Sequence, residues 1–186
     1  MTKKLNIALI GCGGWGKNIA RNLHQIGALA CIYDSDQNLS KKLNQDFKLH
    51  DYTINDIFRN ENIQALVIAS SAKTHRDIAE EALKNNKDVL IEKPFCLSLN
   101  DAITLSKLAI KKNKVLMAGH LLNYHNAFIK MQDLIREGKI GETKNIRAQR
   151  LALGAIRSHE SVIYDLAVHD VSMILSIMQE LPVKIN

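Results

Sequence analysis

The sequence is organised around residues 7–20, Ile-Ala-Leu-Ile-Gly-Cys-Gly-Gly-Trp-Gly-Lys-Asn-Ile-Ala. The stretch begins inside a mostly apolar run, residues 5–10, which has the composition of a fully buried parallel strand. It ends at the start of a segment in which Ile19, Leu23 and Ile26 recur every three or four residues, the spacing of one apolar face of a helix. The sequence therefore predicts a strand, a glycine-rich turn and a helix in direct succession.

The predicted turn carries G-x-G-x-x-G, the pattern of a dinucleotide-binding fingerprint. Gly11 permits the tight turn, Gly13 lets the backbone approach a pyrophosphate, and Gly16 lets the helix pack closely on the strand. The pyrophosphate would lie at the helix N-terminus, where free N–H groups and the helix dipole favour anions. Gly14 and Trp15 belong to the same loop and are predicted to contact the cofactor. A glycine turn in another kind of α/β protein is the alternative.

An acidic residue follows the fingerprint at the expected distance. Asp34 comes directly after a second apolar run, residues 28–33, and stands 18 residues after Gly16. A carboxylate in this place accepts hydrogen bonds from both ribose hydroxyls of an adenosine and repels a 2′-phosphate. The next two residues, Ser35 and Asp36, provide no arginine for such a phosphate. The sequence therefore predicts NAD as the cofactor, in preference to NADP.

The composition is that of an ordinary folded protein. With 186 residues, 46% of them hydrophobic and 24% charged, the chain suits one domain and part of another. The formal net charge of +6 could attract nucleic acid. However, the lysines are interspersed with acids, and the sequence contains no arginine-rich run. We therefore expect no nucleic-acid partner.

The cysteines and the lengths of the apolar runs indicate the cellular compartment. Cys12, Cys31 and Cys96 lack metal-ligand spacing, which favours reduced packing residues in a cytosolic protein and no metal site. The apolar run 5–10 is shorter than the hydrophobic region of a signal peptide. No run approaches the roughly 20 apolar residues that a membrane span requires. We therefore expect a cytoplasmic protein without membrane contact.

Strand and helix patterns alternate up to residue 118, which predicts an α/β fold with a doubly wound parallel sheet of Rossmann type. The expected strands are 5–10, 28–33, 47–50, 64–69, 88–91 and 114–118, and further helices are expected at 38–46, 54–58, 73–84 and 99–112. The ligand crevice of such a sheet lies at the carboxyl ends of its strands. Beyond the fingerprint and Asp34, the residues expected there are Ser70, Ser71, Glu92, Lys93 and His120.

The pattern changes after residue 120. A helix is expected at 127–138, an antiparallel strand at 144–153, a long helix at 160–179 and the start of another strand at 181–183. We therefore predict an NAD-binding domain over 1–120 and, over 121–186, part of an α+β substrate domain with an open sheet. On the long helix, Asp165 and His169 stand at positions i and i+4, close enough to interact.

Four motifs, in this order, resemble those of the Gfo/Idh/MocA oxidoreductases: GCGGWGKN at 11–18, EKP at 92–94, GH at 119–120 and DLAVHD at 165–170. The resemblance covers essentially the whole chain. It is strongest to the family's bacterial nucleotide-sugar 3-dehydrogenases, which oxidise the C3 hydroxyl of UDP-N-acetylglucosamine or of its uronic acid with NAD. The resemblance thus implies oxidation of a sugar hydroxyl by hydride transfer, in surface-polysaccharide biosynthesis.

The resemblance also implies the catalytic residues. Lys93 stands where the nicotinamide is expected, and a cation there stabilises negative charge on the reacting oxygen. His169 is a proton acceptor near neutral pH, and Asp165 could orient it or bind a substrate hydroxyl. The sequence leaves open whether Lys93 or His169 removes the proton.

The remaining candidate residues are implied with less specific roles. His75 and His120 are expected on the cofactor side of the crevice, and Tyr124 and His125 near the substrate. Arg150 and Arg157 precede the helix of Asp165 and could meet a substrate carboxylate or diphosphate. Plain solvated arginines are the alternative.

A second hypothesis is that the chain is a binding protein and not an enzyme. The family's second domain is an open sheet with several more strands than this sequence carries, so the chain could be a truncated NAD-binding remnant or subunit that catalyses nothing. An uncovered strand edge and unpaired apolar surface would favour a homo-oligomer or a complementary partner chain.

Overall fold

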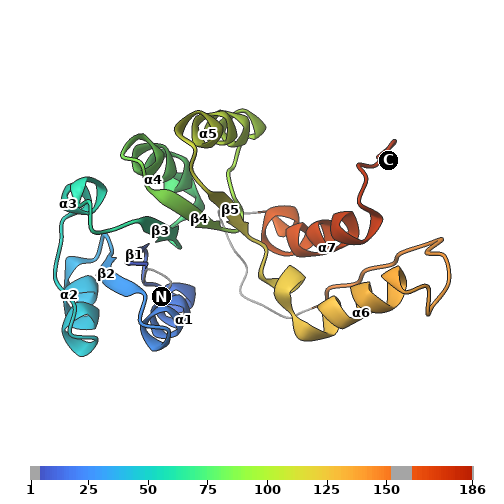
Figure 1. Cartoon of the computed structure of the whole chain (residues 1–186), viewed down its shortest axis with the longest axis horizontal. Helices are drawn as coiled ribbons and strands as arrows, with labels where there is room; N and C mark the ends of the chain where they lie inside the picture. Colours follow the sequence, from blue (N-terminus) through green and yellow to red (C-terminus); the bar gives the residue numbers. More distant parts are fainter. Residues whose placement is uncertain (1–4, 152–160, 186) are drawn as a thin grey trace. The chain divides into compact units, whose positions relative to one another are not determined.

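The computed structural model describes residues 5–151 and 161–185, and the chain divides into two compact units, Met1–Gly119 and His120–Asn186. The first unit contains a parallel sheet with helices on both faces (Figure 1). Its strands are β1 (Ile7–Ile10), β2 (Leu29–Tyr33), β3 (Ala65–Ile68), β4 (Asp88–Glu92) and β5 (Leu116–Gly119). They lie in the order β2-β1-β3-β4-β5, and every neighbouring pair is parallel. The predicted Rossmann-type α/β fold is confirmed.

Five helices connect these strands, and local sequence signals mark where several of them begin. They are α1 (Gly14–Gln25), α2 (Gln37–Asp46), α3 (Ile54–Arg59), α4 (Ala72–Lys84) and α5 (Leu99–Lys112). Asp36 accepts hydrogen bonds from the first free N–H groups of α2, and Ser98 does the same for α5. Thr53 and Asp56 form a reciprocal capping box at the start of α3. Such caps satisfy N–H groups that a helix leaves unpaired, so they set the helix boundaries.

Alternate residues of the central strands face two separate cores. Ala8 and Ile10 of β1 pack in a cluster with α3, α4 and α5, whereas Leu9 packs in a second cluster with α1 and α2. In β3, Leu66 joins the first cluster and Val67 the second. Both faces of the sheet are therefore buried, which explains why these strands are apolar throughout rather than alternating.

Residues 47–50 form no strand, so this prediction is wrong. Phe47 caps the C-terminus of α2, and Lys48 turns the chain with a φ of 56°. The N–H of Leu49 donates to the carbonyl of Asn44 in the last turn of α2, at 2.7 Å. Phe47 and Leu49 pack against the second core cluster. Their apolar character thus serves a helix end, because the backbone groups that a strand would need are used to close α2.

Helices are the regular elements in the described residues of the second unit, and residues 141–151 have no regular secondary structure. It contains the short 3-10 helix η1 (Leu121–Tyr124), α6 (Asn126–Arg136), the π-helix η2 (Ile163–Ala167) and α7 (Val168–Met178). The strand predicted at 144–153 does not form over 144–151, and Ala152 and Leu153 lie outside the described residues. The strand expected to open at 181–183 is also not formed. An isolated strand has no partner for its backbone groups, and the described part of this unit offers none.

The described residues contain neither a membrane-spanning helix nor a metal-binding cluster. Every helix in the described ranges is too short or too polar to cross a membrane. Within the same ranges, no group of three or more His, Cys, Asp or Glu side chains is arranged to hold a metal ion.

Candidate functional site

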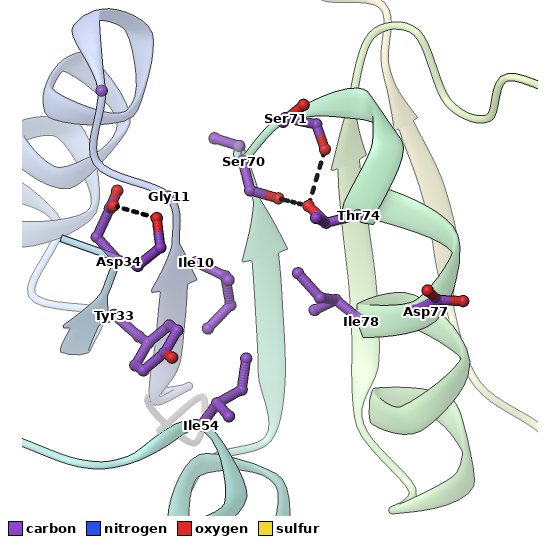
Figure 2. A pocket seen from close by; sticks show the side chains of 13 residues that line it. Ile10, Gly11, Tyr33, Asp34, Ile54, Ser70, Ser71, Thr74, Asp77 and Ile78 are labelled. Atoms are coloured by element: carbon purple, nitrogen blue, oxygen red, sulfur yellow. Dashed lines mark hydrogen bonds between the residues drawn. The ribbon is translucent and has the colours of Figure 1, made fainter. Parts of the chain in front are cut away.

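A cavity of about 500 Å³ opens at the carboxyl ends of β1, β2 and β3, which is within the usual size range for small-molecule and cofactor sites. Gly11, Gly13, Asp34, Ser70 and Ser71, all expected in the crevice from the sequence, line it. Figure 2 shows an apolar part of the lining that the sequence did not single out, formed by Ile10, Tyr33, Ile54 and Ile78. The polar residues thus lie beside a surface that suits a flat apolar ring.

The glycines of the fingerprint fall into two classes. At Gly11 (φ 93°) an added Cβ would lie 2.4 Å from the backbone nitrogen of Ser70, and at Gly16 it would lie 2.2 Å from the carbonyl oxygen of Gly11. At Gly13 and Gly14, by contrast, no atom lies within 4 Å of the added Cβ. Gly11 and Gly16 are therefore required by the fold itself.

The start of α1 offers a place for a pyrophosphate. Gly13 caps this helix without any side-chain hydrogen bond, and the first turn contains no acidic residue. The space beside Gly13 and Gly14 lies at these helical N–H groups. A helix N-terminus of this kind attracts phosphate oxygens through its N–H groups and its dipole. The residues present therefore fit a dinucleotide.

Asp34 joins the end of β2 to the glycine loop. Its Oδ2 accepts hydrogen bonds from the backbone nitrogen of Cys12 at 2.7 Å and from the Cys12 thiol at 3.4 Å. Its Oδ1 accepts from the backbone nitrogen of Asp36 at 3.0 Å and from the Ser35 hydroxyl at 3.3 Å. Burial raises the pKa of the Asp34 carboxyl, but these hydrogen bonds together lower it below its usual value. Asp34 is therefore a fixed anion at the cavity wall.

Cys12 is an inert thiol. Burial, and then the neighbouring Asp34 charge, raise its pKa to about 12, so the reactive thiolate is absent near neutral pH. Burial alone raises the pKa of Cys31 to about 12 as well. Both side chains are buried, consistent with the packing role predicted for them.

Ser70, Ser71 and Thr74 form a hydrogen-bonded turn at the start of α4 (Figure 2). The Thr74 hydroxyl donates to the carbonyl oxygen of Ser71 at 2.8 Å. Because a hydroxyl has one proton, the Ser70 hydroxyl is the donor in its 2.8 Å contact with Thr74. Thr74 was not among the predicted site residues, although it fixes two that were.

The carboxyl end of β4 meets the glycine loop at Glu92. The indole Nε1 of Trp15 donates to Glu92 Oε1 at 3.0 Å, and Glu92 Oε2 accepts from the backbone nitrogen of Lys93 at 3.3 Å. A Cβ on Gly119, at the end of β5, would lie 3.1 Å from the same carboxyl group. The fold therefore brings Trp15, Glu92 and Lys93 together at the carboxyl end of β4, although none of the three is among the residues that line the cavity.

His75 is enclosed by the chain. The side chain is buried, with 1% of its surface exposed. Its Nδ1 lies 2.9 Å from the carbonyl oxygen of Pro94, and its Nε2 lies 3.1 Å from the carbonyl oxygen of Ser70. Both neighbours are acceptors, so a neutral ring donates its one N–H to one of these two carbonyls and a protonated ring donates to both.

In the second unit, the predicted residues lie on or beside its helices. His120 follows β5 directly, Tyr124 is 63% exposed at the end of η1, and His125 Nδ1 accepts from the backbone nitrogen of Ala127, so that it caps α6. Asp165 lies in the π-helix η2, and the buried His169 lies in the first turn of α7. Turns of π-helix are frequent at functional sites. Lys93 belongs to the first unit, whereas Asp165 and His169 belong to the second.

Arg150 is held by an aspartate. Its Nε donates to Asp170 Oδ2 at 3.0 Å and its Nη2 donates to Asp170 Oδ1 at 2.9 Å, a bidentate pair. Each partner favours the charged form of the other, so the pKa of Arg150 is raised and that of Asp170 is lowered. Asp170 directly follows His169 in α7. Arg157, the other candidate arginine, lies outside the described residues.

The chain is similar in sequence and in fold to known dehydrogenases. The chain is 28% identical over 183 residues to the UDP-N-acetylglucosamine 3-dehydrogenase of Acidithiobacillus ferrooxidans, covering 98% of this chain and 57% of that protein. It is 26% identical over 187 residues to the myo-inositol 2-dehydrogenase of Thermotoga maritima, covering 95% of this chain and 55% of that protein. A solved structure of the A. ferrooxidans enzyme has a TM-score of 0.87 at 26% identity, covering 98% of this chain and 59% of that one.

The chain therefore spans little more than half the length of these curated relatives. The family described as "Oxidoreductase family, NAD-binding Rossmann fold" matches residues 5–120, which hold all of the glycine loop, Asp34 and Lys93. This match extends over more than half of the sequence and coincides with the parallel sheet and its crevice. The chain thus belongs to the Gfo/Idh/MocA oxidoreductase family, and its cofactor is NAD.

Proposed function

We propose that this protein serves in the NAD-dependent oxidation of a secondary hydroxyl group, with C3 of a UDP-sugar as the first candidate, in surface-polysaccharide biosynthesis. The observation that carries the proposal is the placement of Lys93, a cation, directly after β4 and beside the contact between Trp15 of the glycine loop and Glu92. The similarity to a UDP-N-acetylglucosamine 3-dehydrogenase over 98% of the chain supports the choice of substrate.

Oxidation of an alcohol removes a hydride from carbon and a proton from oxygen, and bound NAD supplies the hydride acceptor. In this proposal, Lys93 donates a hydrogen bond to the reacting oxygen and stabilises the negative charge that develops on it. His169 or Lys93 accepts the proton, and Asp165 orients the imidazole or binds a substrate hydroxyl. Asp34 and the N–H groups of α1 hold the adenosine ribose and the pyrophosphate.

A cyclic polyol is a second candidate substrate. The chain is nearly as similar to a myo-inositol 2-dehydrogenase, at 26% identity over 95% of its length. The geometry of Arg150 favours this alternative, because Asp170 already occupies the Nε–Nη2 edge of the guanidinium, one of the edges through which an arginine binds a phosphate. A polyol carries no phosphate and therefore needs no such arginine.

Turnover and binding assays separate these candidates. We expect the purified chain, with saturating NAD, to bind UDP-N-acetylglucosamine more tightly than myo-inositol, as measured by ligand-observed NMR, and to form NADH only with the ligand it binds. The reverse preference would select the polyol. NAD binding without binding or turnover of either compound would contradict the proposal and favour the non-catalytic alternative.

The cofactor preference gives a second test. The double variant Asp34→Asn/Ser35→Arg removes the negative charge that repels a 2′-phosphate and adds a cation that can pair with it. The asparagine Oδ1 keeps an acceptor for one of the backbone N–H groups that Asp34 now binds. We expect the ratio of NADPH to NADH affinity to rise by about tenfold or more, equivalent to about 1.4 kcal/mol.

Quenching of Trp15, the single tryptophan of the chain, measures both affinities in this experiment. Ser35→Arg alone is the matched control, since it adds the cation but keeps the carboxylate. An unchanged ratio in the double variant would show that Asp34 does not face the adenosine ribose.

A further inference from the structure

His75 lies between the segments that follow β3 and β4, beyond the last residues through which these two strands are paired. The paired residues of β3 and β4 end at Ile68 and Ile91. Ser70 and Pro94 lie two and three residues further on, and their carbonyl oxygens lie 3.1 Å and 2.9 Å from the two ring nitrogens of His75. One side chain from α4 thus lies between two turns that the paired residues of β3 and β4 do not reach, and its ring N–H can donate to a carbonyl of either turn.

Burial gives this connection its strength. His75 is 1% exposed and Pro94 is buried, so water does not substitute easily for a lost ring N–H. A buried carbonyl left without a donor is destabilising, and an apolar side chain of similar size would fill the volume of the imidazole without supplying that donor. The neutral ring donates one N–H and the protonated ring donates two. A neutral ring protonated at Nδ1 therefore donates to Pro94 and ties the Lys93–Pro94 turn to α4, which begins at the β3–α4 turn, whereas the protonated ring donates to both carbonyls.

Lys93 lies in the turn whose Pro94 carbonyl faces the His75 ring. Lys93 stands between Glu92, which accepts the Trp15 indole N–H at 3.0 Å, and Pro94, whose carbonyl faces the imidazole. The residues on both sides of the lysine therefore contact other parts of the unit, Glu92 through its carboxylate with the glycine loop and Pro94 through its carbonyl with α4. We propose that His75 is a positioning residue that fixes the Lys93–Pro94 turn against the β3–α4 turn. Its effect on catalysis rests on the function proposed above for Lys93.

The Trp15 indole reports on this turn without any activity. Because the chain has one tryptophan, its Nε1–H gives a single indole signal in a ¹⁵N–¹H NMR spectrum, and that proton is bonded to Glu92, adjacent to Lys93. We expect His75→Leu to shift or broaden this signal, and His75→Gln, whose amide can still donate, to retain most of the wild-type position. His50→Leu is the matched control, since it changes an exposed histidine of the same unit.

A measurement on the wild-type protein covers the case in which His75→Leu fails to fold. We expect a His75 ring N–H proton that exchanges slowly with water, unlike those of the exposed His24 and His50. Ring protons at His75 that exchange as fast as those of His50 would overturn the proposal. An unchanged indole signal in folded His75→Leu would do the same.

Kinetics separate positioning from cofactor binding. We expect His75→Leu to lower kcat by about 10- to 100-fold, because a displacement of about 1 Å can cost 10²-fold in rate, while the KM for NAD changes by less than about threefold. His75→Gln should recover most of the rate. A loss confined to NAD affinity would show a cofactor contact and contradict positioning. If the wild-type protein turns over no substrate, the proposed function fails, and the two NMR measurements decide the inference by themselves.

Discussion

Gly16→Ala is expected to lower the free energy of unfolding by about 3 kcal/mol or more and to abolish NADH binding, at the upper end of what overpacking costs. The added methyl group would lie 2.2 Å from the carbonyl oxygen and 3.0 Å from the carbonyl carbon of Gly11. Both atoms are backbone, at the turn between β1 and α1, so no side chain can rotate away. The helix would have to move off the strand, and its N-terminal N–H groups would move with it. Urea unfolding and quenching of Trp15 by NADH measure the two effects.

Gly13→Ala is the matched control for this prediction. No atom lies within 4 Å of the added methyl group, and the φ of Gly13 is −61°, which alanine adopts freely. We expect a stability loss below about 1 kcal/mol, from the poorer helix cap, together with at least about tenfold weaker NADH binding, because the methyl group occupies the path of the pyrophosphate. Equal stability of Gly16→Ala and Gly13→Ala would contradict the division of the loop into structural and cofactor glycines.

Lys93→Met is expected to lower kcat by about 10²- to 10⁴-fold, the usual cost of removing a group that stabilises charge or transfers a proton. Methionine keeps most of the volume of the side chain and removes its charge. NADH affinity, measured by Trp15 quenching, should change by less than about threefold, since the adenosine and pyrophosphate contacts lie at Asp34 and at the start of α1. His169→Ala is expected to have a loss of rate in the same range.

Lys107→Met provides the control for this experiment, because it removes the same charge from an exposed position on α5. Its kcat should match that of the wild type. A near-normal rate in Lys93→Met or in His169→Ala would remove that residue from the catalytic machinery.

Local signals in the sequence predicted most elements of the first unit. The strand, glycine turn and helix around Gly11 form as expected, and α5 has the predicted bounds, Leu99–Lys112. Of the two candidate caps in the sequence, Ser98 and Asn100, the structure uses Ser98. These features depend on groups a few residues apart, such as a cap and the N–H groups of the next turn. Periodicity and capping therefore describe them without knowledge of the rest of the chain.

The wrong secondary-structure predictions fall where the same apolar pattern is compatible with more than one backbone structure. Phe47 and Leu49 were expected in a strand, and they instead pack beside the end of α2, whose backbone the turn at Lys48 closes. The π-helix η2 was also not predicted, since the sequence pattern of 160–179 is that of one continuous helix. In both cases the hydrogen-bond partner of each backbone group decides the outcome, and apolar periodicity does not specify that partner.

By itself, the sequence determined the five parallel strands of the first unit, the dinucleotide fingerprint and the acid at Asp34, because each of these depends on residues close together along the chain. Only the tertiary structure decided which distant groups meet. The bonds from Trp15 to Glu92 and from His75 to Pro94 span 77 and 19 residues, and the strand order β2-β1-β3-β4-β5 brings their turns to one edge of the sheet. That order follows from how the helices pack across both faces of the sheet, a global property that no local pattern contains.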